Sequence, residues 1–121
     1  MAYTKIPESF VHCAMAGADL SAKLNYLGKV DTDGRIILAT AGSIGFPIIE
    51  AAATNSPVTI QFGGIGKAIA GGSFNAGVDL GVDGNGKLVT AGSGVAVVGH
   101  SLMAADSGDV ISYIVAPAGS P

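Results

Sequence analysis

The side chains best suited to chemistry in this chain are few and far apart. His12 and His100 are the two histidines, and Cys13 is the single cysteine. Ser101 follows His100, but Met103 stands where the Gly-x-Ser-x-Gly pattern of hydrolases needs its last glycine. His12 and Cys13 would point to opposite faces of a strand, and protein metal sites use three or four ligands. The sequence therefore predicts no catalytic residue, no metal site, no cofactor and no enzyme activity.

Two isolated reactive groups have structural interpretations. We expect Cys13 to be a small buried hydrophobic residue. A single cysteine excludes an intrachain disulfide and fits assembly in a reducing cytosol. Glu50 stands in an otherwise apolar run, which places it either at the rim of a strand or at a subunit contact, and we favour the rim.

Two acidic turns are the clearest local signals. Residues 31–34 (Asp-Thr-Asp-Gly) and 83–86 (Asp-Gly-Asn-Gly) resemble the start of a calcium loop, but neither has the bidentate Glu that such a loop needs later. Asp-Gly and Asn-Gly are typical of type I′ hairpin turns, in which both central residues have positive φ. Each turn therefore predicts a β-hairpin.

These turns belong to an internal repeat. Residues 30–36 return as residues 82–88, 52 positions later, and residues 39–43 return as 89–93, 50 positions later. We expect each copy, about 27–61 and 78–113, to contain a hairpin, a Thr-Ala-Gly-Ser turn and a further strand. A Gly-rich duplicated unit without a catalytic signature is typical of a scaffold that acts through its surface.

The remaining pattern is that of strands. Apolar residues alternate with polar ones over 58–62 and over 111–115, as expected for strands with one buried face. Pro47 assigns its strand to a sheet edge or to a bulge. Residues 19–27 are the best candidate for a short helix. We predict an all-β fold, a compact sandwich-like or barrel-like domain of short strands with at most one or two short helices.

Composition narrows the classes of partner. Hydrophobic residues make up 49% of the 121 residues and charged residues only 12%, about half the usual share. Such a surface predicts contact with another protein chain. The net charge of −3, the lack of a basic stripe and the absence of Trp argue against nucleic-acid binding. We expect no membrane span, because the uncharged stretches are too polar and too broken by glycine. We expect no secretory signal, because the first residues contain no apolar core.

We divide the chain into three parts. Residues 1–13 are expected to form an extended N-terminal arm, 14–116 a single β-rich domain, and 117–121 a flexible tail.

The order of several motifs resembles the capsid decoration, or cement, proteins of tailed bacteriophages. The resemblance covers roughly residues 14–115. It is carried by residues 16–22 (AGADLSA), 27–30 (LGKV), 63–68 (GGIGKA), 76–80 (AGVDL), 82–87 (VDGNGK), 97–102 (VVGHSL) and 107–111 (SGDVI).

This resemblance implies a small β-rich protein that binds the outside of an expanded phage head and reinforces it. The expected partners are the major capsid protein and further copies of the chain, with a trimer favoured. The expected place is the outer capsid surface of the virion, after synthesis in the host cytoplasm. The arm contains the residues that we expect to contact the capsid or another subunit: Tyr3, Lys5, Ile6, Pro7 and Phe10.

Two other functions stay open. One is a different self-assembling phage structural module, such as a head fibre or tail component. The other is a small β-barrel enzyme or ligand-binding protein, which would place a polar pocket at His100 or Asp79.

Overall fold

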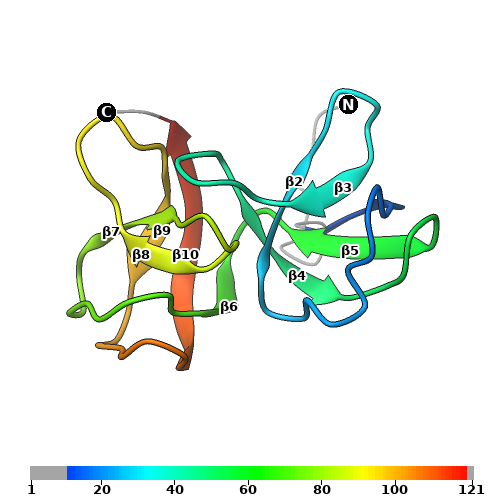
Figure 1. Cartoon of the computed structure of the whole chain (residues 1–121). Coiled ribbons are helices and arrows are strands. Elements are labelled where there is room, and N and C mark those ends of the chain that lie inside the picture. Colours follow the sequence, from blue (N-terminus) through cyan, green and yellow to red (C-terminus); the bar gives the residue numbers. More distant parts are fainter. Residues whose placement is uncertain (1–10, 120–121) are drawn as a thin grey trace, which may run out of the picture.

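The protein consists of two five-stranded sheets that lie side by side (Figure 1). The computed structural model describes the backbone of residues 11–119 and the side chains of residues 11–116. The strands are β1 (Val11–Met15), β2 (Leu27–Val30), β3 (Ile36–Leu38), β4 (Phe46–Glu50), β5 (Pro57–Gln61), β6 (Ile65–Ile69), β7 (Asp79–Val82), β8 (Leu88–Thr90), β9 (Val97–Ser101) and β10 (Val110–Gly119). The predicted all-β fold is confirmed.

Both sheets have the same topology. The first has the strand order β1-β5-β4-β2-β3 and the second β6-β10-β9-β7-β8, so adding five to each strand number converts one order into the other. We call strands β1–β5 the first half of the chain and strands β6–β10 the second half. The strand register matches as well, because Val30 pairs with Ile36 in the first half and Val82 pairs with Leu88 in the second. The chain is therefore a structural duplication of one five-stranded unit.

The duplication also includes β1 and β6, which lie outside the repeat seen in the sequence. Ala16 follows β1 and forms an isolated parallel bridge to β3, and Ala70 follows β6 and forms the same bridge to β8. The two strands share one residue in this alignment, Ala14 with Ala68. Their equivalence comes from their place in the sheet and not from their sequence.

Each half contains the predicted hairpin, but the predicted turn type is wrong. Five residues, not two, separate the paired ends of β2 and β3 and of β7 and β8. In these loops only Gly34 and Gly86 have positive φ, 77° and 73°, whereas a type I′ turn needs two such residues. The carboxylates of Asp31 and Asp83 each accept backbone N–H groups from two and four residues further on, at 2.8–3.0 Å. This side-chain capping closes the longer loop.

The segment expected to form a short helix, 19–27, forms consecutive turns instead. Asp19 Oδ1 accepts hydrogen bonds from the N–H and the hydroxyl of Ser21, at 3.1 and 2.7 Å, and these bonds lower the pKa of Asp19. Asn25 then adopts a φ of 68°, which cannot continue a right-handed helix. No helix occurs within residues 11–119, so none there is available to cross a membrane.

Pro47 is predicted to place its strand at a sheet edge or at a bulge, and the structure shows a bulge in a strand inside the first sheet. Strand β4 has β5 on one side and β2 on the other, and its register shifts between Ile48 and Glu50. Pro47 faces Leu27, which donates its N–H to Gly86 and accepts at its carbonyl from Ala39. The missing N–H of proline therefore breaks no bond with Leu27.

The two halves share a hydrophobic core. One cluster is confined to the first half and includes Leu20, Ile36 and Ile48. The other combines Leu80 and Tyr113 of the second half with residues of the first half, such as Leu27 and Ala39. Backbone hydrogen bonds between described residues also join the halves. They run from Leu27 N to Gly86 O (2.8 Å), from Ile69 N to Asn25 O (3.0 Å) and from Gly42 N to Val82 O (3.1 Å).

Candidate interaction surface

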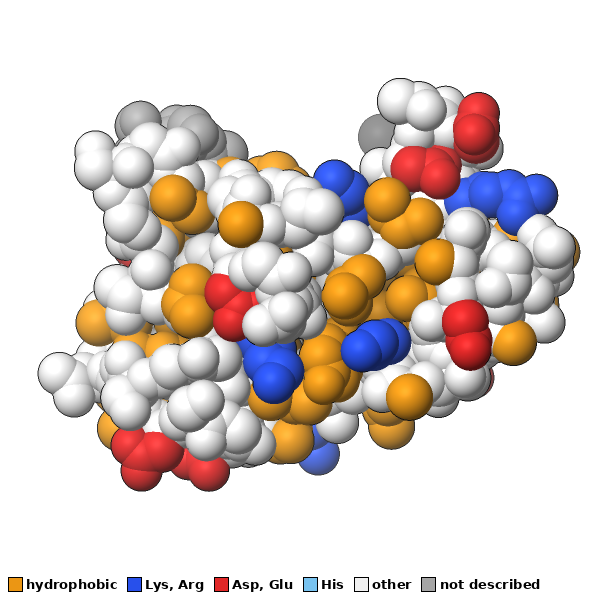
Figure 2. Space-filling model, viewed as in Figure 1, with side chains coloured by type: hydrophobic (Ala, Val, Ile, Leu, Met, Phe, Trp, Pro, Cys, Tyr) orange, Lys and Arg blue, Asp and Glu red, His pale blue; other side chains and the backbone are white. Residues whose placement is uncertain are grey.

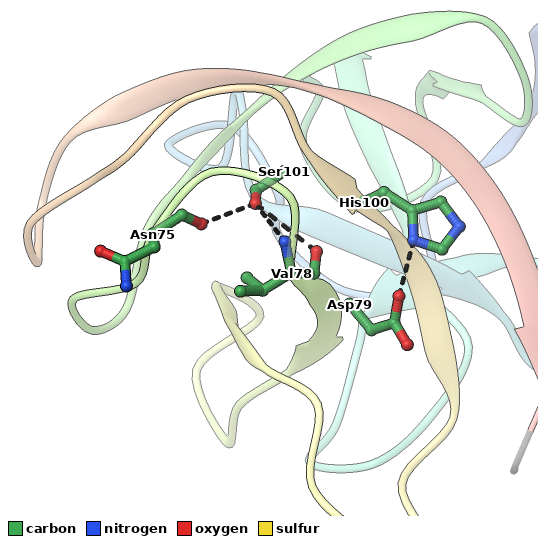
Figure 3. A network of polar contacts seen from close by, with 5 residues as sticks. All are labelled: Asn75, Val78, Asp79, His100 and Ser101. Carbon is green, nitrogen blue, oxygen red and sulfur yellow. Dashed lines mark hydrogen bonds and ion pairs between the residues drawn. The ribbon is translucent and has the colours of Figure 1, made fainter.

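Ser101, His100 and Asp79 are close together but do not form a catalytic triad (Figure 3). His100 Nδ1 lies 2.7 Å from Asp79 Oδ1, with the two side chains 46% and 61% exposed. Ser101 is buried and points to the other face of β9, where it donates to the carbonyl of Asn75 at 2.8 Å. A nucleophile must face its base, and neighbouring residues on a strand cannot do so.

Ser101 has a structural role. Its hydroxyl also accepts the N–H of Val78 at 3.0 Å, so one side chain holds both ends of the 75–78 loop against β9. In the first half, Ile48 occupies the equivalent position and is fully buried among apolar neighbours. Both residues make the same backbone bonds to the preceding loop, from Ile48 N to Tyr26 O and from Ser101 N to Val78 O.

The other reactive residues lie at the surface. Cys13 is exposed, so the prediction that it is buried is wrong. The reason is that β1 is an edge strand, and only Ala14 among its five residues is partly buried. Glu50 lies at the exposed end of β4, as favoured, and accepts a hydrogen bond from the Thr59 hydroxyl at 2.6 Å.

An apolar groove lies on the first half. It has a volume of about 320 Å³ and is lined by His12, Val30, Phe46, Ile60 and Phe62. Val30 and Phe62 are 46% and 41% exposed, and the lining is almost entirely carbon. Open apolar concavities of this kind bind ligands or other chains.

A second hollow lies where the halves meet and is more polar. Its volume is about 430 Å³, and its walls come from both halves: Leu24, Asn25, Ile49, Gln61, Ile65, Gly66 and Lys67. Figure 2 shows hydrophobic side chains gathered along the middle of the visible face, interspersed with basic side chains. Neither hollow is lined by His100 or Asp79, which the enzyme or ligand-binding alternative would require.

The structure does not test the predicted contact residues. Tyr3, Lys5, Ile6, Pro7 and Phe10 lie outside the described residues, as does most of the predicted arm. Sequence reasoning missed the groove. The alternation over 58–62 predicted Phe62 on a buried strand face, yet Phe62 is partly exposed and lines the groove.

Comparison with known proteins gives a match in fold. No protein family model matches the chain, and no curated protein sequence matches it. Among solved structures, the chain is similar to the crystal structure of the head fiber gp8.5 N base of bacteriophage phi29. The TM-score is 0.67 at 16% sequence identity, and the match covers 88% of this chain and 92% of the other. The chain therefore has the fold of a phage head fibre base.

Proposed function

We propose that this protein is a structural component of a tailed-phage virion that attaches to the capsid. The observation that carries the proposal is the fold shared over nearly the whole length of a head fibre base. The low charge of the chain and its open apolar groove fit a protein that works through contacts with other proteins. The major capsid protein is the proposed partner, and the outer capsid surface is the proposed location.

Two finer functions fit this proposal. The motifs that resemble decoration proteins favour a cement protein that reinforces the head. The fold comparison favours the base of a head fibre, which attaches to the capsid without needing to strengthen it. Either function benefits from an oligomer, because several capsid contacts made at once raise avidity without strengthening any single contact.

Binding to heads tests the proposal. Purified protein is mixed with expanded heads that lack it, and bound protein is measured after sedimentation, with unexpanded heads as the control. We expect saturable binding to expanded heads at a fixed number of copies per head. No binding to expanded heads would contradict the proposal, and self-assembly into fibres or sheets without binding would favour a tail or fibre module away from the head.

Heating the decorated heads separates the two finer functions. A cement protein should raise the temperature at which DNA is released, and a fibre base should leave it unchanged. Deletion of residues 2–10 tests the arm within the same experiment. Unchanged occupancy after the deletion would remove Tyr3, Lys5, Ile6, Pro7 and Phe10 from the capsid contact.

A further inference from the structure

The duplication allows each surface of one half to be compared with the same surface of the other. The strand registers fix the equivalences: His12 with Gly66, Val30 with Val82, and Ile60 with Tyr113. By the same registers, Leu27 corresponds to Asp79 and Pro47 to His100. The first three pairs lie on one face of each sheet, and the last two pairs lie on the opposite face.

One surface of the first half is covered by the second half. Leu27 and Pro47 are fully buried. The Leu27 N–H bonds to Gly86 across the boundary between the halves. On the second half, the equivalent surface carries Asp79 and His100, which are 61% and 46% exposed. The first half uses its copy of this surface to bind the second half. On the second half, the equivalent surface is uncovered. This surface around Asp79 and His100 is called the distal face below.

The opposite surface shows the reverse pattern. On the second half, Gly66 and Val82 are buried against the first half. On the first half, their equivalents His12 and Val30 are exposed and line the apolar groove. In the second half, this surface binds the first half, which is a copy of the same unit. The groove is the equivalent surface of the first half, and it is open.

The backbone edge of β1 repeats this pattern. Ile69 of β6 donates its N–H outward, away from β10, to Asn25 O of the first half. Met15 is the equivalent residue of β1. Because Ala16 donates its N–H inward to Ser56, and because successive N–H groups point to opposite sides of a strand, the Met15 N–H points outward. The equivalent of Asn25 is Gly77, which also has positive φ and precedes Asp79 by two residues.

Charge also agrees with this pairing. The Leu27 N–H meets the loop that contains Gly86 and Lys87, and the equivalent loop of the first half contains Gly34 and Arg35. A chain docked in the same way would bring Asp79 near Arg35. It would also bring His100 near His12, because Pro47 and Gly66 are the equivalent neighbours inside one molecule. The contact cannot be an exact copy of the internal one, since His12 replaces a glycine that has no room for a Cβ.

We infer that the groove of one molecule binds the distal face of a second copy of this chain. The contact is head-to-tail, because it joins two different surfaces and repeats the arrangement of the two halves within one molecule. Such contacts generate closed rings or open filaments. The inference concerns the protein alone, so it can fail without affecting the proposed attachment to a capsid.

The mass of the protein in solution tests the contact. We expect the wild-type chain to assemble into a multiple of its 11.8 kDa mass as the concentration rises, measured by sedimentation equilibrium. Val30→Asp places a carboxylate in the apolar groove, and we expect it to weaken assembly roughly 100-fold. The matched control is Val110→Asp, since Val110 is a similarly exposed valine (51% against 46%) at the start of β10. Its first-half equivalent, Pro57, stays exposed and so takes no part in the contact between the halves.

Mixing two defective variants tests the head-to-tail geometry. Val30→Asp keeps the distal face, and Asp79→Lys keeps the groove while placing a cation opposite Arg35. We expect each variant alone to be monomeric and the mixture to form a one-to-one complex, because one intact groove and one intact distal face remain. If the aspartate variant fails to fold by circular dichroism, Val30→Ser should give the same pattern with a smaller effect.

Three results would overturn the inference. A wild-type chain that is monomeric at all concentrations would indicate another occupant, such as the N-terminal residues of the same chain. Assembly that survives Val30→Asp, or that Val110→Asp weakens equally, would place the contact elsewhere. Defective variants that do not complement each other would exclude the head-to-tail arrangement.

Discussion

The two halves have the same strands in the same order, yet they fill the space between those strands differently. In the first half, Gly28 of β2 pairs with Phe46 of β4. In the second, Leu80 of β7 pairs with Gly99 of β9. The large residue has moved from one strand to its neighbour, with a glycine opposite it in each case. The duplicated backbone therefore tolerates either arrangement, because each pairs one large apolar side chain with a glycine.

The halves also differ in what covers them. One surface is open as a groove in the first half, and the equivalent surface of the second half is covered. The opposite surface is exposed at Asp79 and His100 in the second half, and its equivalent in the first half is covered. A duplicated unit that packs on itself in one direction necessarily leaves two unlike open surfaces. The difference between the halves thus marks where a partner can bind.

The largest expected effect is at Gly99. A Cβ there would overlap the carbonyl oxygen of Ile114 and approach the Tyr113 ring at 2.6 Å. The obstruction includes backbone, which cannot rotate away, so we expect Gly99→Ala to lower the free energy of unfolding by about 3 kcal/mol or more. Denaturation by urea measures it. A loss below 1 kcal/mol would mean that the two packing arrangements are less distinct than the structure indicates.

The next effect compares two equivalent turn glycines. Both Gly34 and Gly86 have positive φ, so alanine at either costs about 1 kcal/mol of backbone strain. At Gly34 the added Cβ meets open space, whereas at Gly86 it would lie 2.6 Å from Leu38 of the other half. We expect Gly86→Ala to destabilise the chain by about 2 kcal/mol and Gly34→Ala by about 1 kcal/mol. Equal losses in urea denaturation would contradict the close contact between the halves.

The smallest effect is expected at Tyr113, whose equivalent in the first half is Ile60. Tyr113 is fully buried, and its hydroxyl has no hydrogen-bond partner among the described residues. Burial raises the pKa of this phenol. Removing an unpaired buried hydroxyl relieves its desolvation, so Tyr113→Phe should leave stability unchanged or raise it by up to about 1 kcal/mol. A clear loss of thermal stability would reveal a partner for the hydroxyl.

Much of the fold could be predicted from local patterns. The two Asp-x-x-Gly loops, at 31–34 and 83–86, correctly located equivalent hairpins, because a carboxylate that caps backbone N–H groups is a local device. The same pattern did not reveal the turn type, since loop length depends on where the strands pair. It did not reveal β1 and β6 either, because their equivalence lies in their position in the sheet and only one of five residues is shared.

By itself, the sequence determined that the chain is built of short strands, that it contains two related hairpins and that its surface carries little charge. These properties follow from residue types and spacing, which act over a few positions. Only the tertiary structure decided which member of each pair of equivalent surfaces is buried. Val30 and Val82 are the same residue at the same place in the repeat, yet one is 46% exposed and the other 3%. Their difference comes only from which side of each unit the other unit covers.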